Sequence, residues 1–208
     1  MSLPTEGGLS TRRARSRGAA GRSPLLRWAC VFYGLLAATA LGWNGWAGAH
    51  WAFLDEAAAA AGVRWGRDIA LGLGSAAAVI GASHWITTRT RWGEELAREL
   101  GAAIGPLSRG ESTALAAVSG FAEEVFFRGA LQPRVGWLFA SLLFALAHFA
   151  PRRALWPWTG FALVAGGLLG GLYAATGNLV APIVAHAAIN GINLRRLAAS
   201  SGSAPINR

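Results

Sequence analysis

Long apolar runs separated by short polar segments dominate this chain. Six of these runs lie near the ~20 residues that a helix needs to cross a bilayer. They cover approximately residues 28–49, 68–87, 111–132, 135–150, 158–176 and 178–194. The fourth run is the shortest, and Pro133 is expected to break the chain between the third and the fourth. Because backbone groups inside lipid must be hydrogen-bonded within the chain, the pattern predicts an all-α fold, a polytopic transmembrane helix bundle of about six spans.

The polar segments divide the chain into three parts. Residues 1–24 hold Gly, Ser, Arg and Pro and predict a disordered basic tail, residues 25–198 form a single transmembrane domain, and residues 199–208 form a short C-terminal tail. A cleavable signal peptide that ends near residues 47–49 is the alternative for the N-terminal region, although its apolar run is long. Residues 92–105 mix charged and apolar side chains and predict a short amphipathic helix at the membrane interface. A solvated connector is the other interpretation of that segment.

Composition and charge support a membrane protein. Apolar residues make up 53% of the chain and charged residues only 14%, against about 25% charged in ordinary soluble domains. All 19 basic residues are arginine, and the formal net charge is +9. In a six-span arrangement, fifteen arginines fall in the two tails and in the loops on their side, whereas three fall on the other side. This asymmetry predicts that both termini are cytoplasmic, and it favours membrane topology over nucleic-acid binding.

Ionisable side chains inside apolar spans are the main functional signal. A charge at the bilayer centre costs at least ~2.5–3.5 kcal/mol, so its presence there indicates function. The third span contains Glu123, Glu124 and Arg128, the fourth contains Phe144 and His148, and the sixth contains His186 and Asn190. Taken singly, each of these side chains is more often a structural residue of a helix bundle. Together they indicate a functional site shared by three helices.

Helical spacing assigns these residues to faces. Glu124 and Arg128 are four residues apart, so they share a face and are expected to form an ion pair. Glu123 points about 100° away from Glu124 and lacks that partner. At a rise of ~1.5 Å per residue, Glu123 lies ~18 Å and His148 only ~6 Å from the arginine-rich side, a difference that helix tilt must close.

The chemistry that fits this set is hydrolysis of an amide. A buried carboxylate such as Glu123 is suited to take a proton from water as a general base, and His148 can orient that water or share the proton. An imidazole N–H of His186 and the side-chain amide of Asn190 are donors on one helix face and could stabilise an oxyanion.

Three motifs resemble those of the CPBP family, the CAAX-protease and bacteriocin-processing proteins, also called the Abi family. These motifs are Glu123-Glu124-x-x-x-Arg128, Phe144-x-x-x-His148 and His186-x-x-x-Asn190, in the family's order. The family consists of glutamic-type intramembrane proteases related to the Rce1-type prenyl-protein protease, and the resemblance covers residues of about 90–195. It implies that Glu123 activates water with help from His148, and that His186 with Asn190 forms the oxyanion site. Glu124, Arg128 and Phe144 would be supporting residues.

The resemblance leaves the substrate open. The Lys-free, Arg-, Ala- and Gly-rich composition suggests a bacterial chain in the inner membrane, where a prenylated substrate is not expected. We expect a membrane-associated peptide or protein substrate. Bacteriocin maturation, self-immunity and removal of C-terminal sorting helices all remain open.

Three rival functions compete with this interpretation, and two of them use the same residues. A metal-dependent protease could place zinc on Glu123, His148 and His186, but the helical His-Glu-x-x-His signature is absent and the single cysteine, Cys30, excludes a cysteine-based zinc site. We therefore expect no cofactor. A rhomboid-like serine protease would need a nucleophile that neither Ser119 nor Ser141 supplies in a glycine context. The remaining rival is a non-catalytic membrane protein of the bacteriocin-immunity or ion-binding type.

Overall fold

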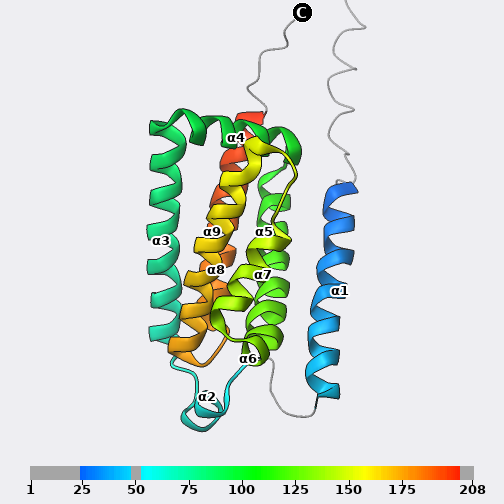
Figure 1. Ribbon diagram of the computed structural model, residues 1–208, viewed down its shortest axis with the longest axis vertical. Coiled ribbons are helices and arrows are strands. Elements are labelled where there is room, and N and C mark those ends of the chain that lie inside the picture. The colour runs from blue at the N-terminus through cyan, green and yellow to red at the C-terminus, as the bar shows by residue number, and fades with distance from the viewer. Residues whose placement is uncertain (1–23, 48–52, 202–208) are drawn as a thin grey trace, which may run out of the picture.

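The computed structural model describes residues 24–47 and 53–201, which are almost entirely helical (Figure 1). The long helices are α1 (Pro24–Trp46), α3 (Trp65–Arg89), α5 (Arg109–Glu124), α7 (Trp137–Ala147), α8 (Trp156–Thr176) and α9 (Val180–Ser201). The shorter elements are α2 (Glu56–Ala61), α4 (Arg91–Ile104), the π-helix η2 (Val125–Leu131), α6 (Gln132–Val135) and the 3₁₀ turn η3 (Arg153–Leu155). The all-α prediction is confirmed for the described part of the chain, whose single β-bridge joins Leu54 to Asn178.

Three of the six predicted spans are long and apolar enough to cross a membrane. They are Leu25–Trp46, Trp65–Arg89 and Arg153–Thr176. The other three predicted spans are helical, but α7 has only 11 residues. Helix α9 includes His186, Asn190 and two arginines, and α5 with η2 contains three glutamates and two arginines. Six membrane crossings therefore remain a prediction. The predicted tail 1–24 and the possible cleavage site at 47–49 lie almost wholly outside the described residues, while α9 extends three residues past the predicted domain end at 198.

The expected break at Pro133 is wrong. The helix continues from α5 through η2 and α6, and Pro133 lies inside this continuous helix as the second residue of α6. The chain turns instead at Gly136, whose φ of 83° is accessible to glycine at little cost. The true start of the helix is a capping box, in which Ser108 and Glu111 satisfy each other's backbone N–H groups.

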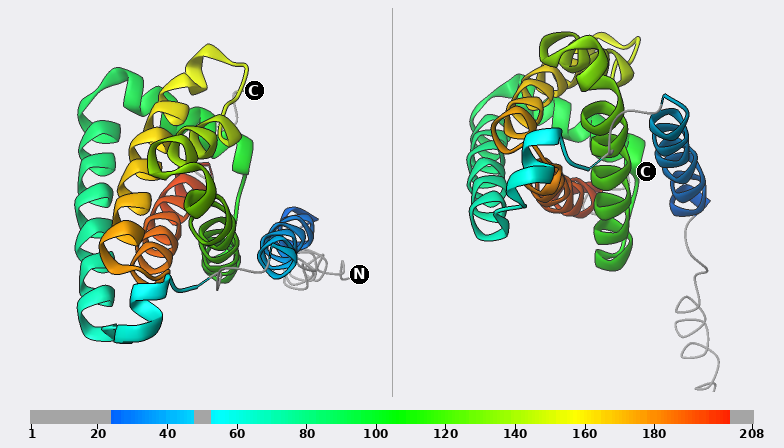
Figure 2. Two further views of the ribbon diagram at one scale, coloured as in Figure 1. Left: turned by 60° about the horizontal axis from the view of Figure 1, so that its bottom comes forward. Right: turned by 90° about the horizontal axis from the view of Figure 1, so that it is seen from below.

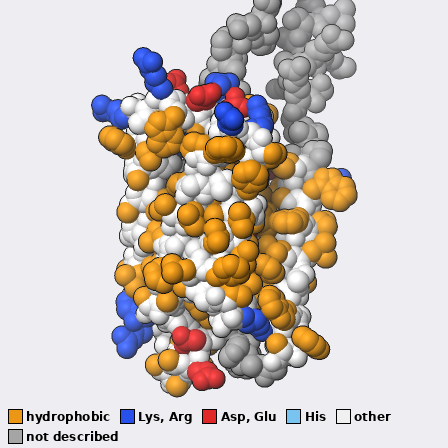
Figure 3. Space-filling model, viewed as in Figure 1, with side chains coloured by type: hydrophobic (Ala, Val, Ile, Leu, Met, Phe, Trp, Pro, Cys, Tyr) orange, Lys and Arg blue, Asp and Glu red, His pale blue; other side chains and the backbone are white. Residues whose placement is uncertain are grey.

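The helices form one bundle with α4 laid across its end (Figure 1). Helix α9 runs along α3 and α5, α7 packs on α8, and α1 packs against α5 and η2 at one side of the bundle (Figure 2). The amphipathic segment 92–105 is thus a helix, with its cap at Thr90. Helix α1 begins and α9 ends at the α4 end of the bundle. Apolar side chains cover the middle of the visible face, and charged side chains lie towards its two ends (Figure 3).

Small residues let the helices of the site approach closely. A Cβ at Gly120 of α5 would lie 3.0 Å from the backbone nitrogen of Ala187 in α9. A Cβ at Gly166 of α8 would lie 3.2 Å from both the Phe144 ring and the Ser141 carbonyl of α7. Such close crossings are typical of helix packing in membranes. They bring α5, α7, α8 and α9 together at the level of the three sequence motifs.

Candidate active site

A pocket of about 230 Å³ lies among α4, α5, α7, α8 and α9, and one residue of α1 reaches it. All four residues predicted to be catalytic line this pocket: Glu123, His148, His186 and Asn190. Glu124 and Arg128 do not line it, and both are fully buried behind it. The sequence motifs therefore separate into residues that face the pocket and residues that support them.

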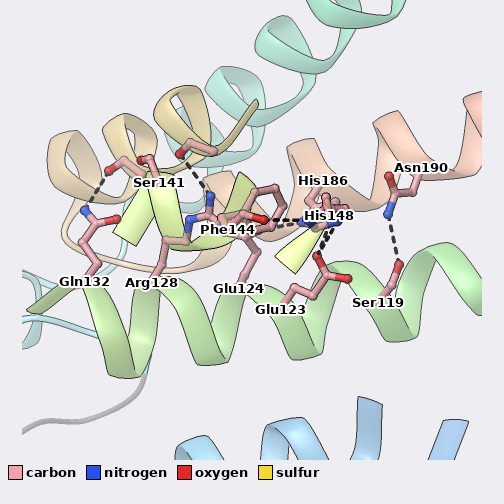
Figure 4. A network of polar contacts seen from close by, with 12 residues as sticks. Ser119, Glu123, Glu124, Arg128, Gln132, Ser141, Phe144, His148, His186 and Asn190 are labelled. Atoms are coloured by element: carbon pink, nitrogen blue, oxygen red, sulfur yellow. Dashed lines mark hydrogen bonds and ion pairs between the residues drawn. The ribbon is translucent and has the colours of Figure 1, made fainter. Parts of the chain in front are cut away.

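Glu123 faces both histidines (Figure 4). Its Oε2 atom lies 3.7 Å from Nε2 of His148 and 3.8 Å from Nε2 of His186. This oxygen is buried and makes no hydrogen bond to any residue that the structure describes. A water held beside these atoms at ~2.8 Å could bond to the carboxylate and to an imidazole together.

The sequence count placed His148 too far from Glu123. The reason is that α7 ends at Ala147, so His148 is the C-cap residue of a short helix rather than part of a full span. The Nδ1 atom of His148 lies 2.8 Å from the carbonyl oxygen of Phe144. Because a carbonyl only accepts, Nδ1 is the donor in this bond, and the ring is held with Nε2 towards Glu123.

Glu124 joins Arg128 to His186. Arg128 Nη1 donates to Glu124 Oε1 at 2.9 Å, so the predicted ion pair is present. Arg128 Nη2 donates to the carbonyl of Gly166 at 3.0 Å. The third member was missed by sequence analysis: Nδ1 of His186 lies 2.6 Å from the same Glu124 oxygen. Glu124 thereby orients the His186 ring so that Nε2 faces Glu123.

Phe144 packs at the centre of the charged groups. Its ring centroid lies 4.5 Å from that of His148 and 5.9 Å from that of His186. The guanidinium carbon of Arg128 lies 4.5 Å from the same centroid, within range of a cation–π contact. The Phe144 ring therefore packs against both imidazoles and the guanidinium group and restricts their movement.

The π-helix η2 directly follows the two glutamates and contains Arg128. Sequence spacing treated this region as a regular α-helix, and no signal in the residues predicted the wider turn. π-turns are rare and occur frequently at functional sites. One residue past η2, Gln132 Nε2 donates to the carbonyl of Gly170 at 3.0 Å, so this part of the helix is bonded to α8 at a second point.

Asn190 is held by Ser119. Its Nδ2 atom donates to Ser119 Oγ at 3.0 Å, across helices α9 and α5. The Ser119 hydroxyl in turn donates to the carbonyl of Ala116 at 3.4 Å, and Ser141 donates to the carbonyl of Trp137. Both serines considered for a rhomboid-like reaction are thus bonded to backbone, and Ser119 instead positions the amide of Asn190. Sequence analysis had named Ser119 only as a weak nucleophile candidate.

No group of three or more His, Cys, Asp or Glu side chains among the described residues is arranged as a metal-binding cluster. Glu123, His148 and His186, the set considered for zinc, share one pocket and face each other at 3.7 and 3.8 Å.

Comparison with known proteins supports the family resemblance. Residues 109–192 match the family model described as type II CAAX prenyl endopeptidase Rce1-like. This segment contains all three motifs, so the resemblance expected from them is confirmed over it. Over 74 residues the chain is 46% identical to the "Uncharacterized protein YpbD" of Bacillus subtilis (strain 168). That match covers 35% of this chain and 38% of the relative, little more than a third of either protein. No solved structure matches the chain.

Proposed function

We propose that the chain is a glutamic-type intramembrane endopeptidase. The proposal starts from the match of residues 109–192 to the Rce1-like family of type II CAAX prenyl endopeptidases. The observation that carries the proposal is the buried Glu123 Oε2, which faces two imidazole Nε2 atoms and makes no hydrogen bond to a described residue. A buried carboxylate that serves only the fold is normally paired, because an unpaired one costs free energy. A carboxylate beside two histidines in a pocket is suited to activating water.

The reaction is hydrolysis of a peptide bond. Glu123 accepts a proton from water while the water oxygen bonds to the scissile carbonyl carbon, which gives a tetrahedral oxyanion. The C–N bond then breaks, and the proton moves from Glu123 to the leaving nitrogen, with His148 Nε2 placed to share it. The products are a carboxylic acid and an amine, and no other reactant is needed.

His186 and Asn190 are the proposed donors to the oxyanion. Nδ1 of His186 is committed to Glu124, so the ring donates into the pocket only when Nε2 also carries a proton. A doubly protonated His186 together with Arg128 balances the charges of Glu123 and Glu124 within the buried cluster. Such balance lowers the cost of burying four ionisable groups. The amide of Asn190, held by Ser119, supplies the second donor.

We also propose a bacterial inner-membrane location with both termini cytoplasmic. The support is that those arginines of the inner side that lie within the described residues fall in α4 or at the ends of other elements on the α4 side of the bundle. The substrate proposed for this orientation is a membrane-associated peptide or protein. The pocket wall includes apolar side chains such as Phe161, Leu169 and Ile189, which suit an apolar residue beside the scissile bond.

The test is Glu123→Gln against Glu95→Gln, the same change at a carboxylate on the exposed face of α4. A library of internally quenched, membrane-anchored peptides in proteoliposomes first identifies a substrate that the wild type cleaves. We expect Glu123→Gln to lower kcat about 10²–10⁴-fold while the protein still accumulates in the membrane, and Glu95→Gln to cleave normally. Wild-type turnover by the Glu123→Gln variant would overturn the proposal, and a wild type that cleaves no peptide would favour the non-catalytic alternative.

Treatment with a chelator distinguishes the proposed metal-free reaction from the metal-dependent alternative. Each polar group of the pocket has a role without metal, so activity should survive exhaustive treatment with chelator. Loss of activity that stoichiometric zinc restores would instead make Glu123, His148 and His186 metal ligands.

A further inference from the structure

Helix α1 presents one narrow stripe to the bundle. Leu26, Ala40 and Asn44 are buried, and Tyr33 lies on the same stripe, seven residues from Leu26 and from Ala40. The neighbouring Phe32 is 59% exposed and faces away. Although α1 lies outside the family-matched segment, its stripe places one polar aromatic side chain opposite α5.

Tyr33 is the α1 residue that lines the pocket, together with Glu123, His148 and His186. Because α1 packs against α5, the Tyr33 phenol lies in the same pocket as the Glu123 carboxylate, close enough for the two groups to interact. The phenol group is a donor, and the ionised carboxylate only accepts. In a hydrogen bond between them, the Tyr33 hydroxyl therefore donates and the Glu123 carboxylate accepts.

Polar contacts near the C-terminal end of α1 hold the helix in this position. Asn44 Nδ2 donates to the carbonyl of Gly129 in η2 at 3.3 Å, and Arg134 Nη1 donates to Asn44 Oδ1 at 2.8 Å. The guanidinium carbon of Arg134 lies 4.6 Å from the ring centroid of Trp43. These contacts tie α1 to the same continuous helix that carries Glu123. They therefore fix the position of Tyr33 along that helix relative to Glu123.

We infer that Tyr33 is a positioning residue of the active site, whose hydroxyl holds the Glu123 carboxylate in the orientation that faces His148 and His186. This inference rests on the proposed function. A carboxylate in a small pocket has several rotamers, and a fixed donor selects one of them, which keeps the base at the distance that water activation requires. Helix α1 thus contributes to the chemistry as well as to membrane anchoring.

The kinetic test is Tyr33→Phe, which removes only the hydroxyl. Its matched control is Tyr173→Phe, the same change at the other tyrosine of the chain, which is buried in α8 and does not line the pocket. For the loss of one hydrogen bond to a charged group, we expect Tyr33→Phe to lower kcat roughly tenfold to hundredfold. The KM and the melting temperature should stay near the wild-type values, and Tyr173→Phe should retain wild-type kcat.

A double variant shows whether Tyr33 acts through Glu123. Adding Tyr33→Phe to Glu123→Gln should cause no further loss, because the positioned carboxylate is already gone. A Tyr33→Phe enzyme with unchanged kcat, in a protein that Glu123→Gln inactivates, would overturn this inference and leave the proposed function standing. Wild-type turnover by Glu123→Gln would overturn the proposed function.

A readout without activity tests the contact itself. In a Cys30→Ser background, which is free of cysteine, a short bifunctional thiol reagent should bridge Tyr33→Cys and Glu123→Cys. Phe32→Cys with Glu123→Cys is the control, and we expect it not to be bridged, because Phe32 faces outwards. Bridging of both pairs, or of neither, would contradict the placement of Tyr33 whatever the enzyme does.

Discussion

Two buried carboxylates, one in each region of the molecule, differ in how their oxygens are bonded. Asp68 belongs to α3, in the region of obvious membrane helices, and its two oxygens bond to Arg67 at 2.7 Å and to Asn178 at 2.8 Å. Glu123 belongs to the family-matched region and leaves one buried oxygen without a hydrogen bond to any described residue. Burial alone does not distinguish them, and an open oxygen is not enough either, because Glu124 Oε2 is also buried without a hydrogen bond to a described residue. Glu123 differs in that its open oxygen faces two imidazoles and that its side chain lines the pocket.

The surrounding regions differ in the same way. Helices α1 and α3 are long, apolar and largely exposed to the outside of the bundle, and hydropathy finds them directly. Helix α5 with η2 escapes the same criterion because it carries Glu123, Glu124 and Arg128. Every ionisable residue lowers the mean hydropathy of the helix that carries it. The helices suited to membrane anchoring and the helix that carries the proposed catalytic residues are therefore marked by opposite features of the sequence.

The largest effect on the fold should come from Arg128→Ala. It leaves Glu124 buried beside His186 without its guanidinium partner, and breaking one member of a buried pair costs about 3–5 kcal/mol. We expect a strong loss of folded protein in a thermal melt in detergent. Arg98→Ala is the matched control, because Arg98 is 67% exposed and its ion pairs lie on the surface. A stable but inactive Arg128→Ala would instead place Arg128 in the chemistry.

A smaller loss of stability should follow Asp68→Asn. The change removes the ion pair with Arg67 and sets an amide against the amide of Asn178, and it should cost about 1–3 kcal/mol. The kcat per folded molecule should remain at the wild-type value, opposite to the result expected for Glu123→Gln. Equal effects of the two substitutions on kcat would remove the distinction between paired and unpaired carboxylates.

The least perturbing experiment asks whether the helix that carries Glu123 crosses the bilayer, as α1 and α3 are long and apolar enough to do. In the Cys30→Ser background, Gly110→Cys and Val135→Cys lie near the two ends of the continuous helix of α5, η2 and α6. We expect a membrane-impermeant maleimide to label Gly110→Cys from the cytoplasmic side only and Val135→Cys from the other side only, with activity retained. Labelling of both from one side would contradict the six-span prediction.

The sequence by itself determined the helices and the glutamate and two histidines of the pocket. Apolar runs predicted the positions of six helices, and the four-residue spacing of Glu124 and Arg128 predicted their ion pair, because both signals act within one helix. The motifs also named the four residues that the structure gathers around the pocket: Glu123, His148, His186 and Asn190.

The tertiary structure alone decided which atoms meet. The bond from His186 to Glu124 joins residues 62 positions apart, and that from Asn190 to Ser119 joins residues 71 positions apart. Tyr33 belongs to none of the three motifs, and only the packing of α1 against α5 shows that it lines the pocket. Spacing within a helix fixes which face a side chain occupies. The partner on the next helix depends on helix ends, on close crossings at glycine and on the π-turn, none of which a local pattern records.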